Sequence, residues 1–157
     1  MIFVTVGTHN QGFERLIKEA DKAAPELGED VFIQTGYSNY KPRNCKYKNF
    51  LQQQEFENIC SRSSVIITHG GIGSIMTPLM MGKKVIVVPR FKKYGEHNDD
   101  HQIQITKELE SQGKIIAVYE IEKLKDAVHK SKKFKTKAIG KNNRIKKIIE
   151  NFISKGE

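Results

Sequence analysis

Short apolar runs alternate with segments of helical periodicity along most of the chain. Apolar runs of strand length lie at residues 2–6, 31–35, 65–68, 85–88 and 115–118, with a weaker one near 47–51. Between them, apolar residues recur three and four positions apart, which predicts helices around residues 13–20, 56–60, 75–81 and 103–109. Strands that alternate with helices are joined by crossovers and pair in parallel. The pattern therefore predicts an α/β fold with a mainly parallel sheet.

The length and composition fit one domain that covers residues 1–157. A chain of 157 residues can bury a sizeable core, and a hydrophobic content of 38% is typical of a globular protein. No apolar run approaches the roughly 20 residues that span a bilayer. The two cysteines, Cys45 and Cys60, show neither a disulfide framework nor the spacing of a metal site. We therefore expect a cytoplasmic protein with reduced thiols.

The charge is concentrated in a basic, helical tail of about residues 123–157. This tail holds 12 basic and 3 acidic residues, so it accounts for the whole net charge of +9. Such a tail can meet nucleic acid, an anionic membrane or an acidic partner, or it can simply be solvated. Near its end lies an apolar stripe formed by Ile145, Ile148, Ile149, Phe152 and Ile153. The stripe can pack on the protein's own core, in a partner's groove or on a bilayer surface.

Three polar loops follow strands of the predicted sheet, at residues 7–12, 69–74 and 90–102. In an open α/β sheet, ligands bind beyond the carboxyl ends of the strands. The second loop carries Gly70, Gly71, Gly73 and Ser74 between a buried strand and a helix. Free N–H groups at a helix start favour an anion, most often a phosphate. The alternative is a tight turn without a ligand.

Two familiar nucleotide motifs do not match. No Gly-Lys-Ser/Thr closes the glycine-rich turn, so it is not a P-loop, and the first strand is not followed by G-x-G-x-x-G. No acidic residue ends the second strand to hold the ribose of NAD. A dinucleotide site is therefore disfavoured.

The third loop gathers polar groups in the stretch "GEHNDDHQ". His97 and His101 are four residues apart, a spacing that suits a metal on one helix face, but Pro89 and Gly95 make much of this segment a loop. Carboxylate, amide and imidazole groups also suit the hydroxyls of a sugar. Asn98 or Asp99 could in addition cap the helix that follows.

Taken together, these motifs resemble those of the C-terminal half of the GT-B glycosyltransferases of family 28. The resemblance is carried by "VTVGTHNQGFERLI", "QTGYSNYKPRNCKY", "HGGIGS", "GKKVIVVPR" and "DDHQ", in order, over roughly residues 1–120. The stretch "PRFKKYGEHNDDHQ" is most similar to the small bacterial PssE-like subunits that build capsule and exopolysaccharide. The eukaryotic Alg13 subunit is a more distant relative. The resemblance implies a Rossmann-like domain.

The resemblance also implies a UDP-sugar donor, with no metal and no other cofactor required. The diphosphate would be held by Gly7, Thr8 and the glycine corner formed by His69, Gly70, Gly71, Gly73 and Ser74. The uracil would meet the backbone near Phe50 and Leu51. The donor sugar, of the galactose, glucuronate or N-acetylglucosamine class, would meet His101 and Gln102. Many members carry a glutamate for the ribose where this chain has Thr77, so the ribose contact could shift to Asp99 or Asp100.

A GT-B enzyme needs two such domains, and this chain has room for one. The resemblance therefore implies a separate membrane-anchored subunit that binds a lipid-linked acceptor. The apolar stripe of the C-terminal helix is the expected contact with that subunit. The chain would lie at the inner face of the cell membrane. His9 is the local candidate for the general base, although it could equally orient the turn or touch phosphate, and the base could lie in the partner.

Two other functions stay open from the sequence. A stand-alone nucleotide-binding or regulatory protein would bind UDP without transferring sugar. A nucleic-acid binder would use the basic tail, but no aromatic and basic strand of the RNA-binding kind is present, so no nucleic-acid partner is expected.

Overall fold

The computed structural model describes residues 1–136 together with residues 139, 147, 150 and 154. The apolar stripe predicted between residues 145 and 153 lies outside the described residues. Among the described residues, no helix has both the length and the apolar character needed to cross a membrane.

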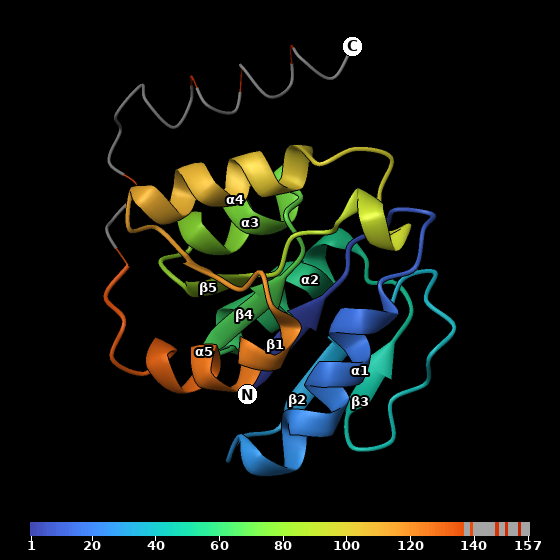
Figure 1. Ribbon diagram of the computed structural model, residues 1–157. Coiled ribbons are helices and arrows are strands. Elements are labelled where there is room, and N and C mark those ends of the chain that lie inside the picture. Colours follow the sequence, from blue (N-terminus) through green and yellow to red (C-terminus); the bar gives the residue numbers. More distant parts are fainter. Residues whose placement is uncertain (137–138, 140–146, 148–149, 151–153, 155–157) are drawn as a thin grey trace.

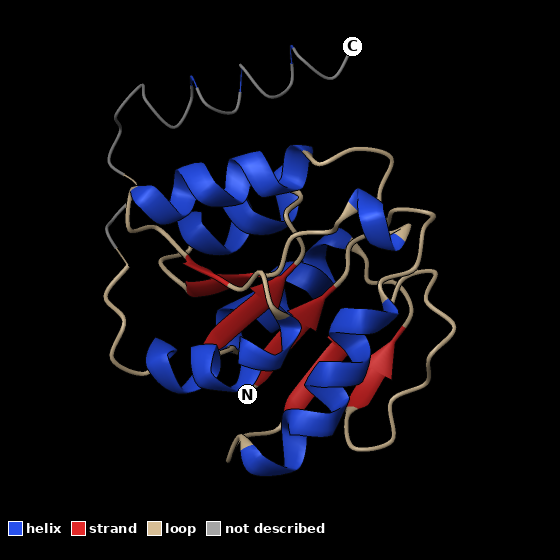
Figure 2. Cartoon of the chain, in the orientation of Figure 1, coloured by secondary structure: helices blue, strands red, loops and turns tan. Residues whose placement is uncertain are grey.

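Six parallel strands form one sheet at the centre of the molecule (Figures 1 and 2). They are β1 (Ile2–Thr5), β2 (Val31–Gln34), β3 (Lys46–Lys48), β4 (Val65–Thr68), β5 (Lys84–Val87) and β6 (Ile116–Ala117). The order across the sheet is β3-β2-β1-β4-β5-β6, and every neighbouring pair is parallel. The α/β fold with a parallel sheet expected from the sequence is therefore confirmed.

Helices cover both faces of the sheet. Helices α1 (Glu14–Ala23) and α5 (Leu124–Ser131) lie on one face, and α2 (Gln53–Arg62), α3 (Ile72–Met80) and α4 (His101–Ser111) lie on the other (Figure 1). Three short 3-10 turns complete the described chain, η1 (Ala24–Glu26), η2 (Lys92–Tyr94) and η3 (Ile121–Lys123).

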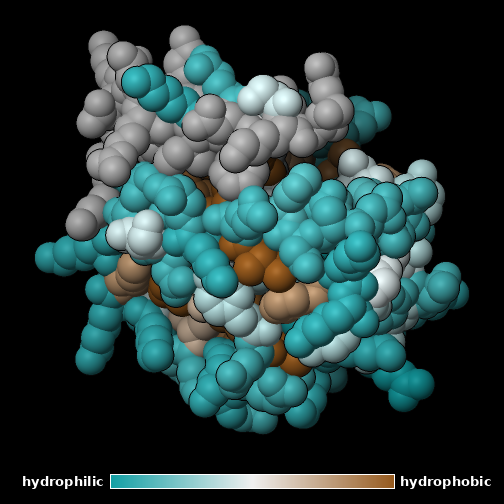
Figure 3. Space-filling view, turned by 45° about the horizontal axis from the view of Figure 1, so that its top comes forward, coloured by the Kyte–Doolittle hydropathy of each residue, from teal (hydrophilic) through white to brown (hydrophobic). Residues whose placement is uncertain are grey.

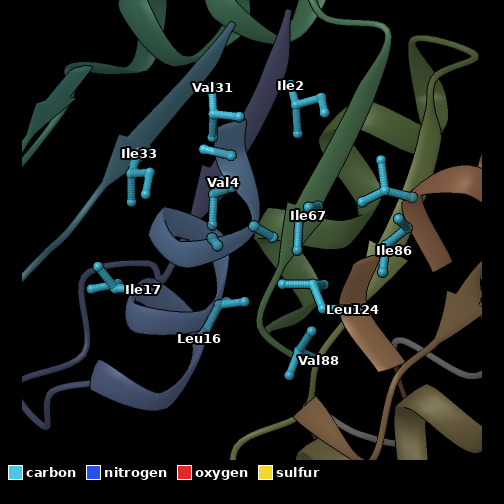
Figure 4. Close-up of a cluster of buried hydrophobic side chains, with 14 of the residues drawn as sticks. Ile2, Val4, Leu16, Ile17, Val31, Ile33, Ile67, Ile86, Val88 and Leu124 are labelled. Carbon is cyan, nitrogen blue, oxygen red and sulfur yellow. The ribbon is translucent and has the colours of Figure 1, made fainter. Parts of the chain in front are cut away.

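The alternation of side chains along the strands explains why both faces are covered. Ile2 and Val4 of β1 point into the core under α1 and α5, shown in Figure 4, whereas Phe3 points to the other face against α2. All three side chains are completely buried. Buried parallel strands need apolar residues on both faces, and the sequence supplies them as continuous runs. The visible surface in Figure 3 is correspondingly mostly hydrophilic.

The sheet places the three polar loops at one edge. Thr5 of β1 pairs with Gln34 of β2 on one side and with Thr68 of β4 on the other, so the carboxyl ends of these strands are level. The chain order reverses between β1 and β4, because β1 leads to β2 on one side and β4 leads to β5 on the other. A crevice at such a reversal is the usual ligand site of an open α/β sheet.

One buried carboxylate holds the long connection between β2 and β3. Asp21 of α1 accepts hydrogen bonds from the Tyr40 hydroxyl at 2.8 Å and from the backbone N–H groups of Arg43 and Asn44 at 3.0 and 2.7 Å. These hydrogen bonds favour the charged form and hold the pKa of Asp21 below its usual range, although burial acts in the opposite direction. The connection is thereby tied to α1.

Candidate functional site

A cleft of about 530 Å³ opens at the carboxyl edge of the sheet, over β1 and β4. Its volume lies within the range of small-molecule sites. The loop after β1 and the segment around η2 lie side by side there, at the upper right of Figure 1. The cleft is lined by Gly7, Thr8, His9, Gln34, Leu51, Gln53, Phe56, His69, Gly71, Gly73, Ser74, Thr77, His97 and Gln102.

Most of the residues singled out in the sequence come together in this cleft. Those that line it are Gly7, Thr8, His9, Leu51, His69, Gly71, Gly73, Ser74, Thr77 and Gln102. Gly70 lies behind the lining, where its N–H donates to Gln102 Oε1 at 3.0 Å. Asp100 and His101 do not line the cleft. Asp100 accepts a hydrogen bond from the Lys92 N–H, and the His101 side chain is 50% exposed with its Nδ1 3.4 Å from Asp99 Oδ2.

His69 explains why two of the glycines are required. Its ring is 92% buried and lies between the backbones of Gly7 and Gly71. A Cβ at either glycine would overlap the imidazole, and Gly7 also has a φ of +73° that disfavours other residues. A Cβ at Gly73, in contrast, would meet no atom within 4 Å. Gly73 therefore leaves open space at the cleft wall.

Hydrogen bonds connect His69 to its neighbours through both ring nitrogens. Nδ1 accepts the Gly71 N–H at 3.2 Å and lies 3.2 Å from Gln102 Nε2. Nε2 lies 3.2 Å from Ser74 Oγ. Burial, reinforced by the charge of Arg90, lowers the pKa of His69 to about 3, so the ring is neutral at physiological pH.

The start of α3 faces the cleft with unpaired donors. The first intrahelical bond runs from the Ile75 N–H to the Gly71 carbonyl at 3.1 Å. The N–H groups of Ile72, Gly73 and Ser74 therefore precede the helical ladder, as they do at every helix start. Together with the positive end of the helix dipole, they make this position suited to an anion.

A buried arginine, which the sequence analysis did not single out, holds the loops around the cleft. Arg90 is fully buried, and its guanidinium donates to the carbonyls of Val6, Gln11 and Glu96 at 2.8 to 2.9 Å. It also stacks on the Phe13 ring at 4.9 Å. Burial lowers the pKa of Arg90 to about 10, so its positive charge persists at neutral pH. This charge adds to the attraction of the cleft for anions.

His9 lies in the cleft wall against His97, with ring centroids 4.7 Å apart. Burial, followed by the charges of His97 and Arg90, lowers the pKa of His9, which favours its neutral form. The His9 Nδ1 accepts the Gln11 N–H at 3.1 Å. In the neutral ring Nε2 then carries the hydrogen. This arrangement suits donation of a hydrogen bond better than removal of a proton from an acceptor.

The cleft also contains Gln34, Gln53 and Phe56, which sequence reasoning did not assign to a site, and His97, which it considered as a metal ligand or a sugar contact of the third loop. Gln34 ends β2, where its Oε1 accepts a hydrogen bond from the Thr5 hydroxyl at 2.7 Å.

The described lining of the cleft holds no Asp or Glu. Within the described part of the chain, no three His, Cys, Asp or Glu side chains are grouped as metal ligands.

Comparison with known families gives one match over nearly the whole chain. Residues 1–154 match the glycosyltransferase family 28 C-terminal domain. Among curated proteins, no sequence matches the chain significantly.

Solved structures show the same fold. The kitacinnamycin glycotransferase has a TM-score of 0.61 at 18% identity, over 83% of this chain and 34% of its own. SsfS6 from Streptomyces sp. SF2575, complexed with thymidine diphosphate, has a TM-score of 0.55 at 18% identity, over 85% and 35%. The solution structure of ALG13 has a TM-score of 0.63 at 21% identity, over 91% and 90%. The chain thus spans about a third of the first two proteins and most of ALG13.

Proposed function

Because the chain belongs to the glycosyltransferase family 28 C-terminal domains, we propose that its cleft binds the nucleotide part of a UDP-sugar donor. The observation that carries this proposal is the start of α3, where Gly73 and Ser74 face the cleft at the point where the strand order reverses. SsfS6, which has the same fold, was crystallised with thymidine diphosphate. That complex supports a nucleoside diphosphate as the ligand class.

In this proposal each part of the cleft takes one part of the donor. The diphosphate lies at the Gly73–Ser74 helix start and near the Gly7–Thr8 turn. The uracil lies by Leu51, next to the ring of Phe56, and Thr77 offers its hydroxyl to the ribose. Of the two residues expected at the donor sugar, only Gln102 lines the cleft.

Binding of the diphosphate is proposed to need no metal ion. The described lining has no carboxylate that would repel a diphosphate or require a bridging cation. The helix dipole of α3 and the buried charge of Arg90 provide the compensating positive potential.

The acceptor is proposed to be lipid-linked and bound by a membrane-anchored partner subunit, as in exopolysaccharide or capsule synthesis. The chain spans about a third of two glycosyltransferases that share its fold, but 90% of ALG13. The transferred sugar would be of the galactose, glucuronate or N-acetylglucosamine class, and the complex would lie at the inner face of the membrane. The competing function is a stand-alone nucleotide-binding regulator without transfer activity.

Calorimetry tests the nucleotide proposal directly. UDP should bind the isolated chain in the presence of EDTA, and it should bind more tightly than uridine, which lacks the anion. Binding that requires a divalent ion would contradict the metal-free site. Equal affinity for UDP and uridine would contradict the placement of a diphosphate at α3.

A further inference from the structure

The Gln102 amide is oriented by two donors whose roles cannot be exchanged. Gln102 stands in the first turn of α4, yet its side chain is 92% buried. Its Oε1 accepts the backbone N–H groups of Gly70 at 3.0 Å and Arg90 at 3.1 Å. A backbone N–H can only donate, so the oxygen must face these two groups. The amide nitrogen must then face His69.

This orientation determines which nitrogen of His69 carries the hydrogen. Both the Gly71 N–H and the Gln102 amide nitrogen point at Nδ1, each at 3.2 Å. Nδ1 is therefore the acceptor of the neutral ring, and Nε2 carries the hydrogen. The burial that keeps the ring neutral removes the third possibility, an imidazolium with hydrogens on both nitrogens.

The tautomer of His69 in turn determines what the Ser74 hydroxyl can do. With hydrogen on Nε2, His69 donates to Ser74 Oγ across 3.2 Å. The hydroxyl hydrogen of Ser74 is then free to point into the cleft that Ser74 lines. In the opposite tautomer, Ser74 would donate to His69 and turn oxygen lone pairs towards the cleft, which would repel an anion.

We infer that Gln102 is a positioning residue for anion binding, which acts through His69 to commit the hydroxyl hydrogen of Ser74 to the ligand phosphate. This inference rests on the proposed nucleotide site. It gives Gln102 a role that does not depend on contact with the donor sugar, because its oxygen is already occupied by Gly70 and Arg90. UDP has no sugar beyond the ribose, so replacement of Gln102 should weaken the affinity for UDP even though no donor sugar is present.

A double-mutant cycle on UDP affinity tests the connection. Gln102→Met and Ser74→Ala should each weaken UDP binding roughly tenfold or more, the loss expected for one hydrogen bond to a charged group. Because both act on the same hydroxyl, the double variant should bind UDP within about twofold of Ser74→Ala alone. Gln104→Met, on the exposed side of the same helix, is the matched control and should bind like the parent.

Additive losses in the cycle would overturn the inference, since they would mean that Gln102 and Ser74 act separately. Failure of UDP to bind the parent would instead overturn the proposed function. A second measurement covers a Gln102→Met variant that does not fold: long-range ¹H–¹⁵N spectra of the parent should show His69 with hydrogen on Nε2 alone. Hydrogen on Nδ1 would refute the inference without any variant.

Discussion

Burial of His69 makes the stability of the fold depend on pH. Its pKa is lowered from 6.5 to about 3, so between these values the unfolded chain binds a proton that the folded protein does not. The stabilising contribution is complete above about pH 6.5 and is lost as the pH falls towards 3. Acidification from pH 7 to pH 4.5 should therefore lower the free energy of unfolding by about 2 to 3 kcal/mol. Urea unfolding at the two pH values measures this loss.

His69→Gln should lose less stability over this pH interval than the parent, although it starts from a lower value. His129→Gln, at an exposed position of α5, is the control and should keep the full pH dependence. An unchanged acid sensitivity in His69→Gln would show that other groups control it.

Two glycines of the corner should respond in opposite ways to a larger side chain. Gly73→Val should abolish UDP binding while the fold persists, because its Cβ enters open space where a phosphate must approach. Gly71→Ala should instead lower the melting temperature, since its Cβ overlaps His69. Thermal unfolding and UDP calorimetry on both variants separate the effects. A Gly73→Val protein that binds UDP like the parent would place the phosphate elsewhere.

At the scale of elements, Arg90 joins the end of β1, the loop after it and the segment around η2. Its planar guanidinium donates hydrogen bonds to the carbonyls of Val6, Gln11, Gly12 and Glu96. A lysine keeps the charge but cannot make these diverging bonds. Arg90→Lys should therefore destabilise the fold by about 2 to 4 kcal/mol and weaken UDP binding, as measured by denaturant unfolding and calorimetry. The neighbouring Lys93→Arg, at an exposed position, should change neither.

The sequence predicted the elements well where an apolar run carried the signal. The strand expected at residues 65–68 is β4, residue for residue. Strand β3 was expected about one residue later and two residues longer than Lys46–Lys48, because its three residues are exposed and no buried apolar run marks where it begins and ends. Helix α2 begins at Gln53, ahead of its apolar residues, because Gln52 and Glu55 form a capping box.

Only those parts of the site that lie within a single loop could be predicted from the sequence. The glycine corner was visible because its residues are adjacent in the chain. The hydrogen bonds from the Gly70 N–H to Gln102 and from Arg90 to the Gln11 carbonyl join residues 32 and 79 positions apart. Such contacts depend on the register of the sheet and on how the loops pack, and neither can be predicted from a local sequence pattern. For the same reason His101, one position before Gln102, was expected in the cleft but does not line it.

At the scale of the whole molecule, the proposed division of labour predicts that donor binding and transfer can be separated. The described cleft lining has no carboxylate to serve as general base. In neutral His9 the nitrogen without a hydrogen, Nδ1, already accepts the backbone N–H of Gln11. The isolated chain should therefore bind UDP but transfer no sugar from a panel of UDP-sugars. Co-expression with the membrane-anchored partner should restore transfer to a lipid-linked acceptor. Robust turnover by the chain alone would contradict the division.

The contact with that partner is proposed to involve the apolar stripe of the basic tail. Replacement of Ile149 and Phe152 by Asp puts charge into the stripe and should abolish co-purification with the partner, while UDP still binds in the cleft. Replacement of Lys146 and Lys147 by Gln, which keeps the stripe, separates apolar docking from attraction to anionic lipid: it should leave co-purification intact and weaken sedimentation with anionic vesicles. If the Asp variant loses UDP binding and cooperative unfolding together, the stripe belongs to the core of this domain, and the partner must dock elsewhere.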